Sequence, residues 1–409
     1  MNEANRRVRI MATQQGSQVT GVEVIPDFLL MDSPDAAKTG SESGFYGWPT
    51  KDIKAITLLD GEGRSVRVRT PVMDLEGLIT PVDLHYVVQH FDVPAVADPK
   101  QWKLEVTGEV KRPLTIDFEM LRRYPGRTVR TVMECSGSDA TFYEYLKGEG
   151  PKPSRTSEHM ILSTGEWTGI PLAAVLNDAG LTGKATHVRA EGWDKGLPAT
   201  AVEGTEPFYY DKGLPIEKAI HPDTLIAVAH NGQLLEHLHG APARLIVPGW
   251  SGNWSVKWLW KLQVLDHEPA CWYHYNFYYY GDSAEDPNKE LITTIGVRSI
   301  ITQPNDDTDT LPQGVNVVRG YAWSGGGHIN QVELSLDGGK TWNATRLEGP
   351  QDPYMWVRWS YLWDAQKAGK YTLMARATDA AGREQSHTPR YNIMRKNFSA
   401  IVGYDVTVG

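Results

Sequence analysis

Residues 237–259 read His-Leu-His-Gly-Ala-Pro-Ala-Arg-Leu-Ile-Val-Pro-Gly-Trp-Ser-Gly-Asn-Trp-Ser-Val-Lys-Trp-Leu, and this stretch combines imidazoles, glycines and two fixed cations. The apolar runs Arg244–Pro248 and Val256–Val264 predict two strands on either side of a polar turn. Arginine forks match phosphate oxygens and glycine lets the backbone approach them, so the stretch suits a phosphate or another anion. A polar turn between two core strands is the alternative interpretation.

Cys135 is the second informative feature. It follows the β-favouring run Arg130-Thr-Val-Met-Glu134 and precedes the small, polar turn Ser136-Gly-Ser138, so the sulfur is expected at a strand end. Cys271 is the other cysteine, and two thiols are too few for a disulfide framework or a tetrathiolate zinc site. Any sulfur chemistry therefore belongs to one thiolate, and the alternative is an inert buried thiol.

Composition excludes some classes of partner. The chain has 409 residues, enough for about two or three domains, and a formal net charge of −9. A negative surface does not attract phosphate backbones or acidic headgroups, which argues against a nucleic-acid or membrane binder. The pair Arg6-Arg7 is not followed by an apolar stretch, so no export signal is expected. As written the protein is expected in the cytoplasm, or in the periplasm if a signal peptide was removed.

The chain divides into three segments by its patterning. Residues 1–70 are polar and turn-rich and are expected to form an N-terminal arm. Residues 71–300 contain apolar residues at both strand and helix periods. Trp102–Gly108 alternates as a strand does, whereas Ile116–Tyr124 and Pro171–Ala179 have helical spacing. A mixed α+β domain is therefore predicted for residues 71–300.

Residues 301–409 have a different character. Val315–Trp323, Gln331–Leu336 and Tyr371–Ala377 alternate as strands, and Asp337-Gly338 is a hairpin signal. Several short strands at this spacing predict a β-sandwich of immunoglobulin type.

Taken in order along the chain, several motifs resemble the sulfite oxidase family of molybdenum enzymes. The motifs that carry the resemblance are Tyr86-Val-Val-Gln-His90, Glu134-Cys-Ser-Gly137, His239-Gly-Ala-Pro-Ala-Arg244, Ser255-Val-Lys-Trp-Leu259 and Ser335-Leu-Asp-Gly-Gly-Lys-Thr-Trp342. Together they cover about residues 75–400 and resemble a sulfite-oxidase-type molybdopterin domain followed by an Ig-like dimerisation domain. The resemblance implies a homodimer.

The resemblance also implies a cofactor and its site. The cofactor is the molybdenum cofactor, Mo-molybdopterin, with the Cys135 thiolate as the protein ligand of the metal. Tyr278, within a tyrosine-rich run at 273–280, is expected beside the metal, and Arg358 resembles an arginine that the family's partner domain supplies. The residues expected to bind the cofactor are His90, Asp194, His239, Arg244, Ser255, Val256 and Lys257.

The sequence departs from the family pattern at two places that concern the substrate. Sulfite-oxidising members carry arginines at two places where this chain has Val88 and the run Ser138–Thr141. Each lost charge-assisted hydrogen bond weakens a dianion site by about 1.5–3 kcal/mol. The candidates for replacement cations are Lys147, Lys152, Arg155 and Arg358.

The resemblance thus implies oxidation of sulfite to sulfate by oxygen-atom transfer. Oxidation of protein-bound sulfur, as in sulfane dehydrogenases, or of another small substrate is the alternative. The sequence has no Cys-x-x-Cys-His haem motif, so electrons are expected to leave to an external acceptor such as a c-type cytochrome.

Two further alternatives come from other classes of protein. His237 and His239 on one face of a strand, with His230 nearby, would suit a zinc hydrolase. A binding module without enzymatic activity, built on the sandwich, is the other.

Overall fold

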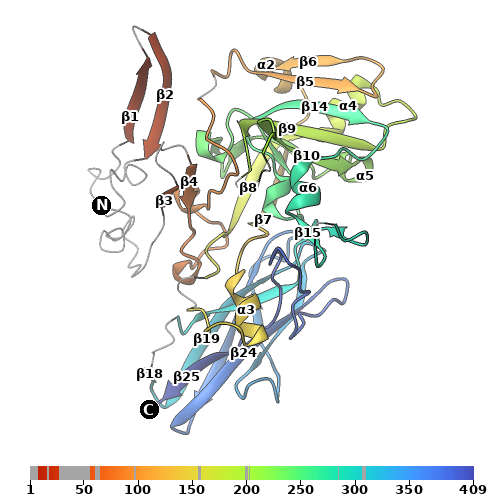
Figure 1. Ribbon diagram of the computed structural model, residues 1–409. Coiled ribbons are helices and arrows are strands. Elements are labelled where there is room, and N and C mark those ends of the chain that lie inside the picture. The colour runs from red at the N-terminus through yellow and green to blue at the C-terminus, as the bar shows by residue number, and fades with distance from the viewer. Residues whose placement is uncertain are drawn as a thin grey trace.

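The structure, a computed structural model, describes residues 8–15, 18–26, 56–59, 65–95, 98–154, 158–198, 201, 203–283, 285–305 and 310–409, with side chains from residue 68 onward. Figure 1 shows two domains in contact, a mixed α/β domain above and a β-sandwich in blue below. None of the described helices combines the length and the apolar character that crossing a bilayer requires.

The N-terminal arm contains paired strands. β1 (Val8–Gln15) pairs antiparallel with β2 (Gln18–Pro26), and β3 (Ile56–Leu59) with β4 (Ser65–Val68). The pair Arg6-Arg7 lies outside the described residues.

The α/β domain is built on two five-stranded sheets. The first has the strand order β10-β9-β14-β5-β6, and all its neighbours are antiparallel except β14 and β5. Its strands are β5 (Lys103–Gly108), β6 (Leu114–Asp117), β9 (His187–Gly196), β10 (Phe208–Pro215) and β14 (Leu259–Leu265). The second has the order β12-β11-β8-β7, and β13 pairs with β11. Its strands are β7 (Arg127–Glu134), β8 (Leu162–Pro171), β11 (Leu225–His230), β12 (Gln233–Leu234) and β13 (Arg244–Ile246).

Short helices and one hairpin connect these strands. The α-helices are α2 (Phe118–Leu121), α3 (Thr141–Lys147), α4 (Leu172–Ala179), α5 (Ile216–Ala219) and α6 (Trp272–Asn276). The 3-10 helices are η4 (Val72–Asp74), η5 (Val82–Leu84), η7 (His237–His239) and η8 (Gly252–Trp254). The hairpin is β15 (Tyr279–Tyr280) with β16 (Glu290–Leu291).

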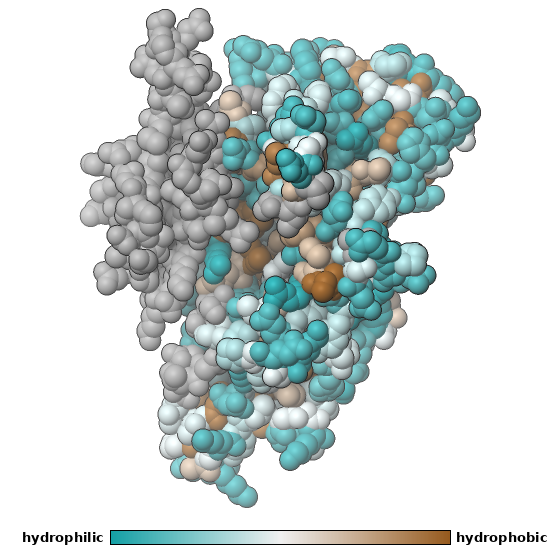
Figure 2. Space-filling model, in the orientation of Figure 1, coloured by the Kyte–Doolittle hydropathy of each residue, from teal (hydrophilic) through white to brown (hydrophobic). Residues whose placement is uncertain are grey.

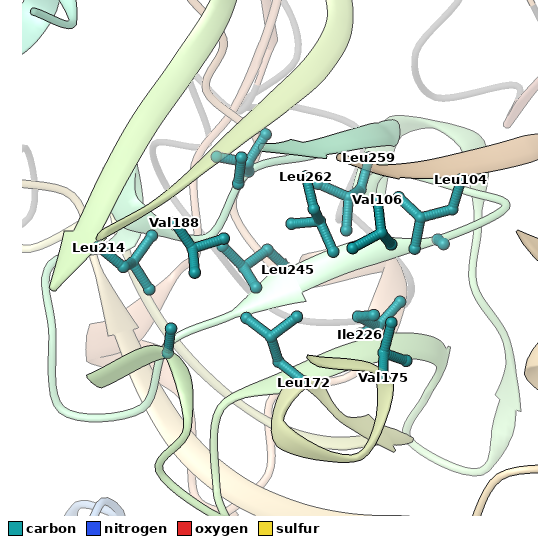
Figure 3. Close-up of a cluster of buried hydrophobic side chains, with 14 of the residues drawn as sticks. Leu104, Val106, Leu172, Val175, Val188, Leu214, Ile226, Leu245, Leu259 and Leu262 are labelled. Atoms are coloured by element: carbon teal, nitrogen blue, oxygen red, sulfur yellow. The ribbon is translucent and has the colours of Figure 1, made fainter. Parts of the chain in front are cut away.

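The main core lies between the first sheet and α4. In Figure 3, Leu104, Val106 and Leu262 of the sheet point toward Leu172 and Val175 of the helix. All five are fully buried. Each such side chain contributes about 1.5–3 kcal/mol by leaving water, so this layer fixes the sheet on which the polar loops sit.

The C-terminal domain is a sandwich of two sheets, as the sequence predicts. One has the order β17-β19-β23-β22 and the other β18-β25-β24-β20-β21. The strands are β17 (Arg298–Gln303), β18 (Thr310–Leu311), β19 (Gly314–Trp323), β20 (Ile329–Ser335), β21 (Asn343–Ala344), β22 (Arg346–Glu348), β23 (Val357–Ala365), β24 (Gly369–Asp379) and β25 (Tyr404–Val408). Its first strand begins at Arg298, three residues before the predicted boundary. Phe142 and Tyr143 of α3 pack into its core, so the α/β domain adds a helix to it.

Three local predictions were wrong. Ile116–Tyr124 is a helix only at Phe118–Leu121, because Leu114–Asp117 pairs with β5 as strand β6. The strand expected from Val256 begins at Leu259, and Trp258 before it has a left-handed φ of 49°. His237 and His239 lie on the 3-10 helix η7 rather than on a strand.

The surface in Figure 2 is mostly hydrophilic on the visible face, with hydrophobic residues in the hollow between the two domains. This pattern agrees with the negative charge and polar composition of the chain.

Candidate active site

One cavity collects most of the predicted site residues. The segment 86–90, the turn after β7, strands β9 and β10, η7, the loop 252–257 and Tyr278 all line it. The predicted residues in its lining are His90, Cys135, Asp194, His239, Arg244, Ser255, Lys257 and Tyr278.

Cys135 lies directly after β7, in the position that the sequence predicts. Its backbone N–H donates to the carbonyl of Ile161 at 3.0 Å, and its carbonyl accepts from the N–H of Ser138 at 2.9 Å. Ser136 Oγ lies 2.5 Å from Ser251 Oγ and donates to Asn253 Oδ1 at 3.1 Å. These bonds fix the turn, so the sulfur is presented to the cavity by a rigid strand end.

His239 and Arg244 form one end of the cavity. Arg244 Nη1 donates to the carbonyl of His239 at 3.0 Å, and its guanidinium stacks 5.0 Å from the Trp167 ring centroid. His239 Nε2 lies 3.1 Å from the carbonyl oxygen of Val82, which fixes the ring. Burial lowers the pKa of Arg244 to about 10 and that of His239 to about 3, so the arginine is the charged group of the two.

Lys257 lies at the same cavity with its ammonium 3.3 Å from the carbonyl of Leu238 and 3.5 Å from Gln89 Oε1. Burial and the Arg244 guanidinium lower the pKa of Lys257, and burial raises the pKa of the neighbouring Asp194. Among the described residues, no carboxylate forms an ion pair with Arg244 or Lys257. Asp194 attracts the Lys257 ammonium but forms no ion pair with the Arg244 guanidinium, so a bound anion would offset the cost of burying these cations.

Several buried polar atoms in this lining have no hydrogen-bond partner among the described residues. They are Gln89 Nε2, Asp194 Oδ1, Arg244 Nε and Asn253 Nδ2. Buried polar groups normally find partners, so an orphaned set around one cavity indicates a polar ligand. A phosphate between Arg244 and Lys257 and a pterin edge along the other atoms match these donors and acceptors, so the residues fit the expected cofactor.

His90 and Tyr278 form the opposite, aromatic side. His90 Nε2 lies 2.5 Å from Tyr278 Oη, and the His90 ring stacks on Tyr210 with a centroid distance of 4.9 Å. Tyr210 in turn donates to the carbonyl of Asn253 at 2.8 Å. Of the tyrosines at 273–280, Tyr278 is the one in the lining, and a place beside the metal stays a prediction for it.

Two predicted residues do not join this cavity. Val256 is buried in the main core, and its carbonyl accepts from the N–H of Leu245 at 2.8 Å, so its role is to hold the loop. Arg358 lines two other cavities beside the sandwich sheet and donates to Glu348 at 2.7 Å. Within one chain the structure therefore does not bring Arg358 together with Cys135.

The proposed substitutes for the missing arginines also point elsewhere. Lys147 lies 4.9 Å over the Tyr391 ring, and Lys152 pairs with Asp405 at 3.5 Å. Arg155 lies outside the described residues. Val88 itself lines the cavity, at the place where the resemblance led us to expect an arginine.

The sequence did not predict Tyr86, Gln89, Tyr210 and Asn253 as lining residues. Tyr86 and Gln89 lie inside the motif Tyr86–His90, and Asn253 lies within the polar stretch 237–259, so their positions in the sequence are a usable signal. Nothing in the sequence marks Tyr210, because its strand β10 is brought to the cavity by the order of the strands in the first sheet.

The zinc site is not supported. The described residues contain no group of three or more His, Cys, Asp or Glu placed to hold a metal ion. His237 Nε2 lies 2.8 Å from the carbonyl of Pro94, whereas His239 faces that of Val82. The two imidazoles are therefore engaged on different partners.

Comparison with known proteins agrees with this geometry. Residues 90–273 match the oxidoreductase molybdopterin binding domain, and residues 289–401 match the Mo-co oxidoreductase dimerisation domain. The chain is 31% identical to sulfite oxidase of Gallus gallus over 337 residues, which cover 78% of this chain and 71% of that protein. It is 34% identical to NADH nitrate reductase 2 of Phaseolus vulgaris over 78% of this chain, but spans only 38% of that relative's length.

Among solved structures, the sulfane dehydrogenase SoxCD from Paracoccus pantotrophus superposes with a TM-score of 0.74 and 28% identity, covering 85% of this chain and 86% of that one. The matched domains and the donor set agree on one cofactor, molybdopterin. The chain therefore belongs to the sulfite oxidase family of molybdopterin oxidoreductases.

Proposed function

We propose that the protein oxidises sulfite to sulfate, with water as the oxygen source, and passes the two electrons to an external acceptor. The observation that carries the proposal is the convergence of Cys135, the His90–Tyr278 pair and the cations Arg244 and Lys257 on one cavity. The identity to an animal sulfite oxidase over most of both chains supports the same substrate.

The bound cofactor supplies oxygen-atom transfer and stores two electrons. Cys135 would hold the metal through its thiolate, and the turn bonds of Ser136 and Ser138 keep the sulfur in place. Arg244 and Lys257 would neutralise the phosphate of the pterin. Because Arg244 is braced by the His239 carbonyl and Trp167, this end is pre-organised before the cofactor binds.

The Tyr278 hydroxyl is the group that positions substrate oxygens. Its contact with His90 fixes the phenol, because an imidazole that carries its proton on Nε2 can donate to the phenol oxygen while the phenol O–H donates to a substrate oxygen. Lys212 lies 4.5 Å over the Tyr278 ring, so the ring is held by a second contact besides the one at its hydroxyl. The water molecule supplies one oxygen and two protons leave the site for each sulfite oxidised.

The Mo-co dimerisation domain supports a homodimer. The electron acceptor we propose is a separate protein, a c-type cytochrome.

A second candidate is the oxidation of sulfane sulfur. It is favoured by Val88, which stands where the resemblance leads us to expect a cation, and by the similarity to a sulfane dehydrogenase over 85% of this chain. A neutral or singly charged sulfur would lose less than sulfite from that change.

The test is a steady-state comparison of sulfite, thiosulfate and a protein-bound persulfide, with ferricyanide and cytochrome c as acceptors. Nitrate reduction by reduced viologen dye runs beside it. Molybdenum and pterin content are measured on the same samples, so that an empty enzyme is recognised. We expect sulfite to give the highest kcat/KM, and a fully loaded enzyme that ignores sulfite would refute the proposal.

A further inference from the structure

A buried lysine lies directly behind the aromatic side of the cavity. Lys212 follows Tyr210 on strand β10, and its side chain is fully buried. Its ammonium lies 4.5 Å over the ring of Tyr278, 5.1 Å over that of Trp254 and 5.7 Å over that of Tyr210. Tyr278 and Tyr210 line the cavity, whereas Lys212 does not. One layer of aromatic rings therefore separates the ammonium from the cavity.

The ammonium of Lys212 is poorly compensated. Its Nζ has no hydrogen-bond partner among the described residues. An ammonium carries three donors, and burying them without acceptors is costly. Cation–π attraction offsets only part of that cost, because each such contact is weaker than a charge-assisted hydrogen bond. The charge on this lysine is therefore sensitive to any further charge placed nearby.

The titratable groups that face Lys212 come from β10 and from α6, which lies against β10 (Figure 1). On β10, Asp211 accepts from Arg189 Nε at 2.7 Å and forms an ion pair with it. Burial raises the pKa of the Cys271 thiol, just before α6, and lowers the pKa of His274, on α6, to about 2. Cys271 and His274 are therefore both neutral near pH 7.

The two phenols complete this set. Burial raises the pKa of Tyr210 well above its ordinary value, and the Tyr278 hydroxyl is in contact with His90. Burial lowers the pKa of Lys212 to about 7. Of these groups, Lys212 is the one whose pKa is moved to neutrality, so a modest change of the field inside the cavity can change its charge.

An anion in the cavity would supply such a change. Charges inside a protein are screened less than charges in water, so a negative charge beyond one layer of rings favours the charged lysine. The coupling is reciprocal: if the anion raises the pKa of Lys212, the proton on Lys212 raises the affinity for the anion by the same factor. Arg244 and Lys257 lie at the phosphate end, where the bound cofactor would already neutralise them.

We propose that Lys212 takes up a proton when a small sulfur oxyanion enters the cavity, and that its ammonium then stabilises the bound anion from behind Tyr278. Lys212 is thus a positioning residue, because it contacts Tyr278 and does not line the cavity. The affinity for the anion should be highest below about pH 7 and fall above it, where the amine of the empty site is neutral. This inference rests on the proposed function for the identity of the anion, but not for the uptake of the proton.

The experiment measures the protons that the oxidised holoenzyme takes up when it binds sulfate. Sulfate keeps its double charge near neutral pH, so any proton taken up belongs to the protein. Calorimetry at about pH 8 in two buffers of different ionisation enthalpy gives this number for wild type and Lys212→Met. Lys218→Met is the matched control, because the Lys218 ammonium lies 5.2 Å over the Trp250 ring and donates to the carbonyl of Pro248 at 2.8 Å, outside the cavity lining.

We expect wild type and Lys218→Met to take up the larger part of about one proton, and Lys212→Met to lack that uptake. At about pH 6, where Lys212 is charged with or without sulfate, the affinity for sulfate should be about 3- to 30-fold lower in Lys212→Met, as for the loss of one buried cation beside an aromatic ring. The affinity should fall from pH 6 to pH 9 in wild type and fall less in Lys212→Met. A lysine that only fills space would not change the proton count.

Equal proton uptake and equal sulfate affinity in wild type and Lys212→Met would overturn the role of Lys212 while sulfite oxidation stands. A holoenzyme that binds no sulfate would overturn it as well. Proton uptake that depends on Lys212, in a loaded enzyme that does not oxidise sulfite, would leave Lys212 in place and remove the proposed function.

Discussion

Arg298, the first residue of the sandwich, donates to the carboxylate of Glu134, the residue directly before Cys135. Its other terminal nitrogen donates to Asp139 at 2.5 Å, and Asp139 also lies 2.7 Å from His159 Nδ1. Trp323 of the sandwich donates to the second oxygen of Glu134 at 2.8 Å. A buried arginine thus ties both sides of the Cys135 turn to the neighbouring domain.

Replacing Arg298 by Met should strongly destabilise the protein. The change leaves two buried carboxylates without their cation, which costs about 3–5 kcal/mol. Denaturant unfolding of the variant should therefore show a clearly lower midpoint. Adding Glu134→Gln and Asp139→Asn to the variant removes the stranded charges and should restore part of the loss. An Arg298→Met midpoint equal to that of wild type would contradict this account.

Replacing Cys135 by Ser should abolish turnover and leave the fold intact. The hydroxyl is a poor substitute for a soft thiolate at the metal, whereas the turn is held by backbone bonds that serine keeps. Activity, molybdenum content and melting temperature check this. Cys271→Ser is the matched control, because Cys271 is buried away from the cavity lining, and it should retain activity. Full turnover in the Cys135 variant would rule out the thiolate as ligand.

Replacing Arg244 by Gln should lower the cofactor content without lowering the stability of the cofactor-free protein. Burial already disfavours the charged guanidinium, so the empty protein loses little. The loaded protein loses a charge-assisted contact to phosphate, which lowers affinity about 10- to 100-fold. Pterin released after gel filtration gives the content, and thermal unfolding gives the stability. Normal pterin content in Arg244→Gln would place the phosphate elsewhere.

Lys212 makes the stability of the folded protein depend on pH. It is fully buried beneath Trp254 and Tyr278, and its ammonium has no hydrogen-bond partner among the described residues. Burial lowers its pKa from 10.5 to about 7, although Cys271 and Asp211 oppose the shift. Between pH 7 and pH 10.5 Lys212 is protonated in the unfolded chain and neutral in the folded protein, so its contribution to the free energy of unfolding rises with pH. Below about pH 7 the lysine is charged in both states, and the full cost of burying its charge remains.

Lys212→Met should therefore stabilise the fold at pH 7 by on the order of 1–4 kcal/mol, and the gain should shrink toward pH 10. Denaturant unfolding of both proteins across this range measures the difference. A gain that is constant with pH would mean that Lys212 binds the same number of protons in the folded and the unfolded state. The cost could then not be assigned to the burial of its charge.

Much of the site could be predicted because its residues occur in ordered motifs. Cys135, His239, Arg244 and Lys257 lie close together in space although only the last three are near in sequence. The order of the motifs along the chain predicted that these residues share one site, whereas periodicity predicted only the strands and α4. Local pattern failed at Ile116–Tyr124, where pairing with β5 outweighed helical spacing.

Arg298 could not be predicted in the same way. It is one of 41 lysines and arginines in the chain, and nothing in the neighbouring residues marks it. Its importance comes from the packing of one domain on the other, which brings it into contact with Glu134 and Asp139, more than 150 positions away in the sequence. Such contacts depend on the whole fold.

Two tryptophans lie beside the two cations that we propose for the phosphate, and their fluorescence can report on the cavity. The Arg244 guanidinium lies 5.0 Å from the Trp167 ring and the Lys257 ammonium 4.3 Å from the Trp258 ring. Indole emission responds to nearby charge, and a phosphate that neutralises these cations changes the field at both rings. Fluorescence can therefore follow the entry of the cofactor in real time, in a chain that needs no added label.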